Sequence, residues 1–299
     1  MIKLDLITGF LGSGKTTFLI KYVNYLKSKN ESICIIENDY GAVNVDMMLI
    51  EKTNVDREMI TGSTDQITRI RRLKTKLISL AMRGYSHIII EPSGIFDKDE
   101  LFDLMYDDTI KNLYELNNII CIYDINTKDL SKDARYVMST EVAISGKIIV
   151  SKRIDKSLVD INYINDSLKE IKCDRLIGDN DIIYEDEIID YSILDNIGYH
   201  NVDHIKMPIF NNPNFSSIYL LDKKYKLSDI KRFKELFLAN YGNIIRIKGF
   251  IFDDTWYQIN ITKNEEEIKK IDLGQDVIII IGENLDEKKI KESIFLKKW

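Results

Sequence analysis

The sequence has few cysteines and no long hydrophobic run, and both absences exclude classes of protein. Its three cysteines lie far apart in apolar surroundings, which predicts buried free thiols in a reducing cytosol and argues against a disulfide framework. The longest wholly apolar run, at residues 277–281, is far too short to cross a bilayer. A strand predicted to begin at Ile2 leaves no room for a signal peptide. The expected location is therefore cytoplasmic, without a membrane partner.

Basic residues are also in deficit. The 48 Asp and Glu residues outnumber the 42 Lys and Arg residues, which gives a formal net charge of −6. Nucleic acid requires a basic face that neutralises its phosphates, so the balance argues against nucleic acid as an obligatory partner. A hydrophobic share of 44% and a charged share of 30% are ordinary for a soluble globular protein and argue against wholesale disorder.

A glycine-rich stretch near the N-terminus is the most specific motif. Residues 9–17 read Gly-Phe-Leu-Gly-Ser-Gly-Lys-Thr-Thr and fill the P-loop pattern G-x-x-x-x-G-K-[ST] without a mismatch. Alternating apolar and charged residues at 2–7 predict a strand before it, and apolar spacing at 18–26 predicts a helix after it. Strand, turn and helix are the context that a P-loop requires.

The residue types of this turn suit a nucleoside triphosphate. Backbone N–H groups of the turn are expected to point at the β-phosphate, assisted by the positive end of the following helix. Lys15 adds a charge between the β- and γ-phosphates, and the Thr16 hydroxyl is a ligand for Mg²⁺. The predicted phosphate-binding residues are Gly9, Gly12, Ser13, Gly14, Lys15, Thr16 and Thr17.

Strand and helix patterns alternate after the P-loop, which predicts a three-layer α/β sandwich with a mostly parallel sheet. Ligands of such folds bind at the carboxyl ends of the strands. The expected domain spans residues 1–178. Residues 179–203 have a polar, Asp- and Asn-rich composition that predicts a connection. Mixed strand and helix patterns over 204–299 predict a small α+β domain.

Acidic residues at strand ends extend the predicted site. Glu91 closes an apolar strand where an acidic residue would hold Mg²⁺, and the Gly94 amide that follows is placed to sense a γ-phosphate. A solvated strand end is the alternative for Glu91. Asp39 lies where a switch segment is expected, with an Asx-turn as its alternative. The predicted catalytic residues are Lys15, Asp39, Glu91 and Gly94, and the predicted Mg²⁺ residues are Thr16 and Glu91.

Base recognition is predicted at residues 151–155, which read Ser-Lys-Arg-Ile-Asp. Guanine-specific P-loop proteins have an Asn-Lys-x-Asp turn here, whose Asp accepts from guanine N1–H and N2–H₂. Lys152 is placed to pack its stem over the base, whereas Asp155 arrives one residue late. Either the loop bulges to bring Asp155 into position, or the guanine preference is relaxed. The predicted base-side residues are Ser151, Lys152 and Asp155.

Taken together, these motifs resemble the CobW-type family of P-loop GTPases, which belongs to the SIMIBI class. The resemblance rests on residues 8–17, on Asn-Asp-Tyr-Gly at 38–41 with Asp46, and on Glu-Pro-Ser-Gly at 91–94. Further signatures, Arg-Ile-Lys-Gly at 246–249 and Ile-Gly at 281–282, are similar to those of the family's C-terminal domain. The resemblance implies GTP hydrolysis coupled to delivery of a metal or a metal-containing cofactor, such as a corrinoid or zinc.

One departure from the family concerns metal binding. Where the family has Gly-Cys-x-Cys-Cys, residues 62–66 read Gly-Ser-Thr-Asp-Gln, and none of these side chains is a thiolate ligand for Zn²⁺ or Co²⁺. His200 and His204 are an alternative metal pair, although histidines beside a linker are more often only exposed. The basic run at 69–76 predicts a solvated helix face, or else a surface for phosphate or an acidic partner.

The sequence therefore predicts a Mg²⁺-dependent, CobW-like GTPase that binds GTP and GDP and acts on a client protein or cofactor enzyme. No arginine finger can be assigned, so we expect slow intrinsic turnover. An ATP-dependent small-molecule kinase and a non-catalytic nucleotide-binding adaptor stay open as alternatives. The client and the oligomeric state, including a homodimer, are left open.

Overall fold

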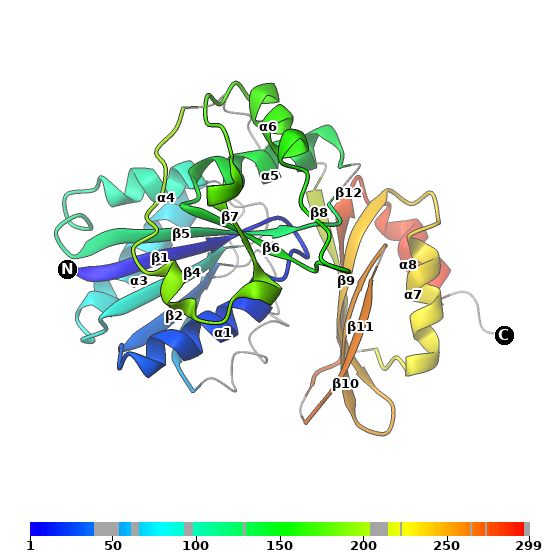
Figure 1. Cartoon of the computed structure of the whole chain (residues 1–299). Helices are drawn as coiled ribbons and strands as arrows, with labels where there is room; N and C mark the ends of the chain where they lie inside the picture. The colour runs from blue at the N-terminus through cyan, green and yellow to red at the C-terminus, as the bar shows by residue number, and fades with distance from the viewer. Residues whose placement is uncertain are drawn as a thin grey trace. The chain divides into compact units, whose positions relative to one another are not determined.

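The computed structural model describes residues 1–38, 54–60, 66–92, 98–127, 130–203, 215–221, 223–263, 265–272 and 274–295. The chain forms two compact units, and the described residues up to 203 belong to the first while those from 215 onward form the second (Figure 1). Several predicted functional residues, Asp39, Gly94, His204 and residues 62–65, lie outside the described ranges.

A parallel seven-stranded sheet forms the centre of the first unit, with strand order β3-β2-β4-β1-β5-β6-β7. Strand β4 contains a continuous apolar run because both faces of the sheet are covered, and its residues Ile88, Ile89 and Ile90 are completely buried. The strands are β1 (Ile2–Thr8), β2 (Ile33–Asn38), β3 (Asp56–Ile60), β4 (His87–Pro92), β5 (Tyr114–Asp124), β6 (Lys147–Ser151) and β7 (Ile182–Tyr184).

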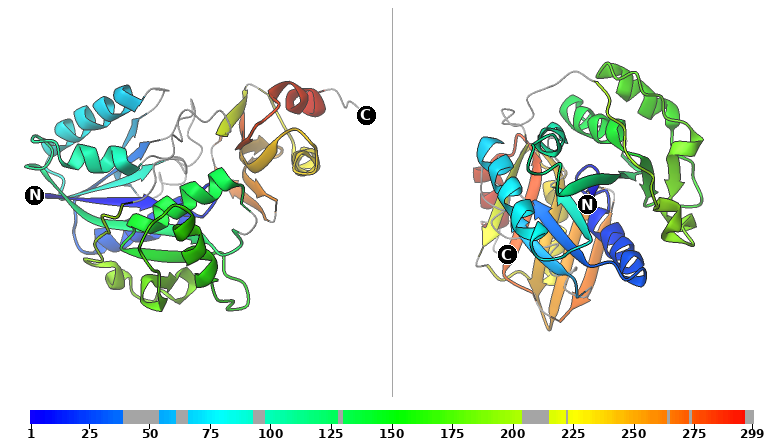
Figure 2. Two further views of the ribbon diagram at one scale, coloured as in Figure 1. Left: turned by 90° about the horizontal axis from the view of Figure 1, so that it is seen from above. Right: turned by 90° about the vertical axis from the view of Figure 1, so that its left-hand side faces the viewer.

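Helices cover both faces of this sheet, as Figure 2 shows. Helix α1 packs its apolar residues on one face, while α3 and α4 pack on the other. The helices are α1 (Lys15–Ser28), α3 (Gln66–Ala81), α4 (Lys98–Met105), α5 (Lys132–Ile144) and α6 (Ile161–Glu170). The predicted three-layer α/β sandwich is thereby confirmed. Among the described residues no helix is long and apolar enough to cross a membrane.

Residues 182–199, which we call the strap, differ from the predicted connection. The strap contributes β7 to the sheet and continues through the 3₁₀ turns η3 (Glu185–Glu187) and η4 (Tyr191–Leu194), after the turn η2 (Asp179–Asp181). Its apolar side chains pack in the same cluster as α1. The sequence did not predict this role, because the apolar residues that anchor the strap alternate irregularly with exposed carboxylates and form no regular strand or helix pattern. The first unit thus continues well beyond residue 178.

The second unit is an antiparallel sheet of strand order β11-β10-β9-β12-β8, with two helices packed on one face. Phe233 of α7 and Ile290 of α8 are fully buried in that core. The predicted α+β architecture is confirmed. The elements are β8 (Phe215–Leu221), the turn η6 (Leu227–Asp229), α7 (Ile230–Leu236), β9 (Asn243–Phe252), β10 (Trp256–Thr262), β11 (Glu266–Ile271), β12 (Val277–Glu283) and α8 (Glu287–Phe295).

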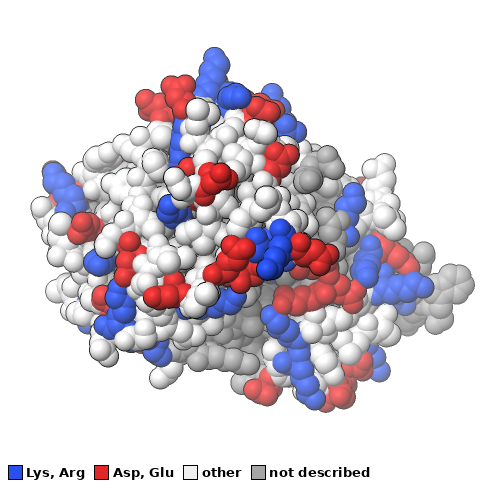
Figure 3. All heavy atoms as spheres, in the orientation of Figure 1, with Lys and Arg blue, Asp and Glu red and all other residues white. Residues whose placement is uncertain are grey.

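Charged side chains of both signs are interspersed on the face shown in Figure 3, where Lys and Arg lie among Asp and Glu. Among the described residues, ion pairs join different elements, such as Lys21 with Glu185 and Lys234 with Glu266, each at 2.7 Å. Exposed pairs of this kind contribute roughly 0 to 1 kcal/mol each to folding.

Candidate nucleotide-binding site

The P-loop connects β1 to α1 at the carboxyl edge of the sheet. Gly9, Gly12 and Gly14 have φ angles of 143°, 79° and 98°, which side chains with a Cβ rarely adopt. A Cβ on Gly9 would also collide with the carbonyl oxygen of Ile122 on β5. The motif glycines are therefore required by the backbone, and the turn opens directly into the first N–H groups of α1.

Helix α1 begins with a terminus suited to an anion. Gly14 is its N-cap and offers no side-chain acceptor, and the first turn of the helix contains no acidic residue. The first N–H groups of a helix lack partners within the helix and carry a partial positive charge. A phosphate group is the ligand that these amides and the helix dipole favour.

Lys15 supplies the charge of the loop. The residue is only 8% exposed, and its Nζ donates to the carbonyl oxygens of Gly9 at 2.6 Å and Phe10 at 3.2 Å. A buried ammonium group needs such acceptors because an uncompensated charge is costly to desolvate. The side chain is thus folded back over its own loop, where phosphate oxygens can take the place of the carbonyls.

The two residues predicted to hold Mg²⁺ are brought into contact, although they lie far apart in sequence. Thr16 Oγ1 donates to Glu91 Oε1 at 2.8 Å, and Glu91 is 8% exposed at the end of β4. Strand β4 lies beside β1, which places Glu91 next to the start of α1. A hydroxyl and a carboxylate are hard oxygen ligands, so the pair fits a magnesium ion.

Glu37 is a buried acid that sequence reasoning assigned no role. It ends β2 in register with Glu91 on β4, and it is only 3% exposed. Register partners on neighbouring parallel strands lie about 5 Å apart and point to the same face of the sheet. The signal that could have identified Glu37 is the one that identified Glu91, an acid that closes an apolar run.

The predicted base-side loop follows β6 and is joined to the P-loop. Ser151 Oγ lies 2.6 Å from the carbonyl oxygen of Ser13 and 3.2 Å from that of Tyr123. A hydroxyl donates one hydrogen bond, and the shorter distance favours the P-loop carbonyl. Lys152 Nζ pairs with Asp124 Oδ2 at 3.2 Å, while Asp155 is exposed.

Arg153, in the middle of the same loop, was given no role by sequence reasoning. Its side chain is only 2% exposed and lies with its guanidinium carbon 4.1 Å from the ring centre of Tyr184 in β7. It also donates hydrogen bonds to Asp186 and Glu187 at the start of the strap. The side chain is therefore held by the strap.

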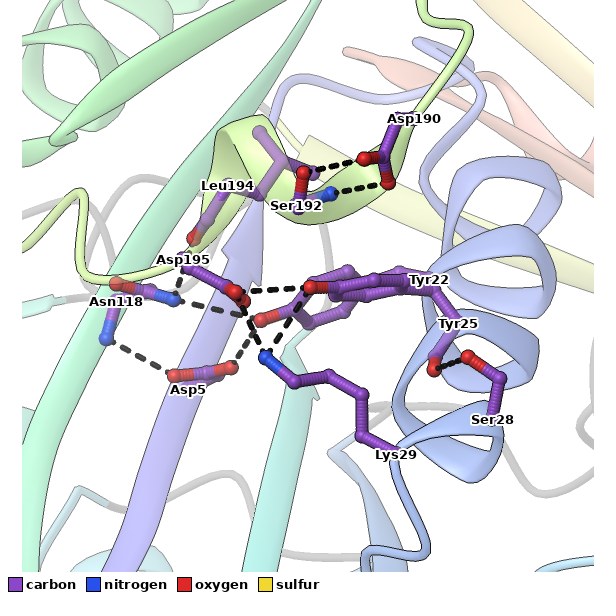
Figure 4. Close-up of polar contacts among 10 residues, drawn as sticks. All are labelled: Asp5, Tyr22, Tyr25, Ser28, Lys29, Asn118, Asp190, Ser192, Leu194 and Asp195. Carbon is purple, nitrogen blue, oxygen red and sulfur yellow. Dashed lines mark hydrogen bonds and ion pairs between the residues drawn. The ribbon is translucent and has the colours of Figure 1, made fainter.

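A buried polar network lies around the middle of β1 (Figure 4). Asp5 is completely buried and accepts from Tyr22 Oη at 2.6 Å and from the backbone N–H of Asn118 at 2.9 Å. His87 Nε2, at 2.7 Å, and Asn117 Nδ2, at 2.8 Å, also contact its carboxylate. Burial and the neighbouring Asp5 raise the pKa of Tyr22. The network fixes β1 against α1, β4 and β5, and hence positions both ends of the P-loop.

Two alternative features of the sequence are described in part, because His204 lies outside the described residues. No group of three or more His, Cys, Asp and Glu residues placed to hold a metal occurs in that part of the chain, and His200 is exposed. In the basic run on α3, Lys74 pairs with Asp107 at 2.6 Å and Lys76 with Glu58 at 2.8 Å. The three cysteines are buried and none forms a disulfide, as predicted.

Comparison with known proteins is consistent with this site. Residues 3–177 match the model of the CobW/HypB/UreG nucleotide-binding domain. In Escherichia coli strain K12, the zinc chaperone YjiA is 22% identical over 273 residues, 85% of this chain and 82% of the relative. The zinc chaperone YeiR of the same strain is 27% identical over 158 residues, 52% of this chain and 48% of the relative. The match thus spans about half the length of YeiR.

Solved structures of similar proteins include the Zn(II)-bound YjiA GTPase from E. coli. Its alignment covers 100% of this chain and 99% of the YjiA chain, with 17% sequence identity and a TM-score of 0.40. Another is HypB from Helicobacter pylori in complex with nickel, covering 57% of this chain and 74% of its own, with 16% identity and a TM-score of 0.38. Since the family match covers more than half of the chain, the protein belongs to the CobW/HypB/UreG family and contains its nucleotide-binding domain.

Proposed function

We propose that the protein binds GTP, hydrolyses it slowly with Mg²⁺, and couples this cycle to the handling of a metal or a metal-containing cofactor for a client protein. The observation that carries the proposal is the contact between Thr16 and Glu91 directly behind an intact P-loop. A strand-to-helix turn with a purely structural role would have no reason to join its first helical hydroxyl to a nearly buried carboxylate from a different strand.

The residues of the site divide the work of hydrolysis in a simple way. The amides at the start of α1 hold the β-phosphate, and Lys15 exchanges its loop carbonyls for oxygens of the β- and γ-phosphates. Thr16 and Glu91 would hold Mg²⁺, which neutralises charge that develops on the phosphates. From the sequence prediction, the Gly94 amide would sense the γ-phosphate, and Asp39 would belong to the switch segment.

Slow turnover follows from the absence of an assigned arginine finger. Arg153, the arginine of the base-side loop, pairs with Asp186 and Glu187 and stacks on Tyr184, so it is not offered to the γ-phosphate. An arginine that reaches the γ-phosphate is worth several orders of magnitude in rate to P-loop GTPases. We propose that a client or a second copy of the chain accelerates the reaction.

The cargo of the cycle is the least constrained part of the proposal. YjiA and YeiR are named zinc chaperones, and this kinship supports metal handling in general. However, residues 62–66 lack the thiolates of the family motif, and the cysteines elsewhere are buried. Burial raises the pKa of Cys34 to about 12, which disfavours the thiolate that would bind a soft metal. We therefore propose oxygen or nitrogen ligands, or a preassembled cofactor such as a corrinoid, as the cargo chemistry.

One set of measurements tests the proposal. GTP, GDP and ATP are titrated into the purified protein with Mg²⁺ or with EDTA, and phosphate release is followed at saturating GTP. Lys15→Ala is expected to abolish binding or turnover, and Thr16→Ala is expected to bind GDP but to lose the Mg²⁺ dependence of GTP hydrolysis. A Lys15→Ala protein that hydrolyses GTP as fast as the wild type would refute the assignment.

The same titration separates the competing functions. Equal affinity for ATP and GTP would favour a kinase over a GTPase, and tight nucleotide binding with no phosphate release above buffer would favour a non-catalytic adaptor. Repeating it with Zn²⁺, Co²⁺ or a corrinoid identifies the cargo. The expected result is a preference for GTP and slow, Mg²⁺-dependent release of phosphate.

A further inference from the structure

The loop that follows β6 adopts a conformation that its own residues do not favour. Lys152, Asp155 and Lys156 have φ angles of 56°, 51° and 55°, in the left-handed region that residues other than glycine rarely adopt. Three such residues within five positions make the loop unfavourable in isolation. Backbone conformations of this kind persist only where surrounding contacts enforce them.

The contacts that enforce this loop come from two sides. On the P-loop side, Ser151 Oγ bonds the carbonyl of Ser13. On the opposite side, the backbone N–H of Val159 donates to the Tyr184 hydroxyl at 3.1 Å, so β7 holds the end of the loop. Arg153 lies between these two ends, and its contacts decide whether the loop is held along its whole length.

Arg153 contacts two carboxylates and one aromatic ring of the strap. Its Nε and one terminal nitrogen donate to Asp186 Oδ2 at 3.2 Å and 2.8 Å, and the same terminal nitrogen donates to Glu187. The planar group also stacks on the Tyr184 ring. The hydrogen bonds from Arg153 hold the pKa of Asp186 below its usual range.

The strap that receives Arg153 is itself fixed to α1. Glu185 pairs with Lys21 at 2.7 Å, next to the two acids that hold Arg153. Farther along the strap, Asp195 pairs with Lys29 at 2.7 Å, and the carbonyl oxygen of Leu194 accepts from Asn118 at 3.0 Å (Figure 4). Because α1 begins at the P-loop, the strap gives the base-side loop a fixed position relative to the phosphate-binding turn.

We infer that Arg153 is a positioning residue for the nucleotide base: by clamping the loop at 152–156 to the strap it sets the affinity and the base selectivity of the site. The inference rests on the proposed function and names the element that determines selectivity. It also accounts for the late position of Asp155, because a loop with one extra residue needs a fixed point between its two ends. Arg153 itself does not contact the reacting phosphate.

This role separates two kinetic effects. Releasing the loop is expected to weaken nucleotide binding equally in the ground state and in the transition state, because the site binds the base in both states. KM should therefore rise while kcat is unchanged. Selectivity should fall as well, since a base held in a mobile loop loses the hydrogen bonds that distinguish guanine from other purines. A loss of stability alone would lower the active fraction and leave selectivity as it was.

The experiment compares steady-state kinetics with GTP, inosine triphosphate and ATP. Inosine triphosphate lacks the 2-amino group of guanine and therefore reports on that single contact. The variants are Arg153→Ala, Arg153→Lys, and Asp186→Asn combined with Glu187→Gln, which keeps Arg153 and removes its charge partners. The matched control is Arg135→Ala on α5. Arg135 pairs with Glu170 at 2.9 Å, and its guanidinium carbon lies 5.9 Å from the ring centre of Tyr163, so this variant also loses an ion pair and a contact with a tyrosine ring.

For Arg153→Ala we expect KM for GTP to rise about tenfold with kcat within about twofold, since a partly buried charge-assisted contact is lost. The preference for GTP over inosine triphosphate should fall in parallel. Arg153→Lys and the double variant should lie between this variant and the wild type, and Arg135→Ala should match the wild type. Thermal unfolding of each variant confirms that it is folded.

The outcomes distinguish this inference from the proposed function. A wild-type protein that does not prefer GTP overturns the proposed function and this inference with it. A wild-type protein that prefers GTP, with Arg153→Ala and the double variant unchanged in KM and selectivity, overturns this inference alone. A fall in kcat at constant KM also overturns it, because Arg153 would then act on the reaction and not on the base.

Discussion

Replacing Asp5 with Ala should destabilise the first unit far more than replacing any exposed acid. The carboxylate is completely buried and receives contacts from Tyr22, His87, Asn117 and the backbone of Asn118. Its removal leaves several buried donors without their acceptor. One unsatisfied donor costs about 1 to 3 kcal/mol, and the donors partly relax together, so we expect a total loss of about 3 to 5 kcal/mol.

The control is Asp195→Ala, and Figure 4 shows Asp195 together with Asp5. Asp195 has two partners, Lys29 at 2.7 Å and Tyr25 at 2.9 Å, and its side chain is 35% exposed. Water replaces those contacts, so the expected loss is at most about 1 kcal/mol. The buried acid and the exposed acid should therefore differ severalfold in their effect on the free energy of unfolding.

The measurement is equilibrium urea unfolding followed by far-ultraviolet circular dichroism, together with thermal unfolding. Nucleotide and Mg²⁺ are left out because a ligand that binds the folded state masks the difference. For a unit of this size, a loss of about 3 to 5 kcal/mol corresponds to a fall in Tm of about 10 °C. Equal effects of Asp5→Ala and Asp195→Ala would refute the reasoning, because the buried network would then contribute no more than an exposed ion pair.

Three further predictions concern Glu58, the buried thiols and Glu37. Hydrogen bonding to Lys76 lowers the pKa of Glu58, so the contribution of Glu58 to stability is present above pH 4.5 and is lost as the pH falls below that value. The free energy of unfolding of Glu58→Gln should therefore fall less steeply at acidic pH than that of the wild type. An unchanged pH dependence would contradict the assignment. The buried thiols, with the Cys34 pKa raised to about 12 by burial, should react with a thiol reagent at about pH 8 only after unfolding, and rapid labelling of the native protein would contradict their burial. Glu37→Gln should raise the Mg²⁺ concentration needed for half-maximal GTP hydrolysis about threefold to tenfold, because the substitution removes a carboxylate beside Glu91. An unchanged Mg²⁺ dependence would show that Glu37 has no part in the site.

Local pattern was sufficient for the parts of the protein whose structure depends on neighbouring residues. The P-loop is set by glycines that allow positive φ and by the strand and helix on either side of it, all within residues 2–28. Several strands are continuous apolar runs because both faces of the sheet are covered, and strand and helix patterns alternate along the chain, so the α/β sandwich could be predicted. Glu91 was predicted as a site residue for the same reason, because an acid at the end of such a run is conspicuous.

Contacts between distant segments decided the rest. Arg153 lies in a charged loop where nothing local shows that it is buried, and its partners Tyr184, Asp186 and Glu187 come from a stretch whose composition predicted only a connection. Asp5 looks like the polar member of an alternating strand until Asn118 is brought beside it. Burial and partner choice depend on which segments the fold places together, and for charged residues no short-range pattern records that outcome.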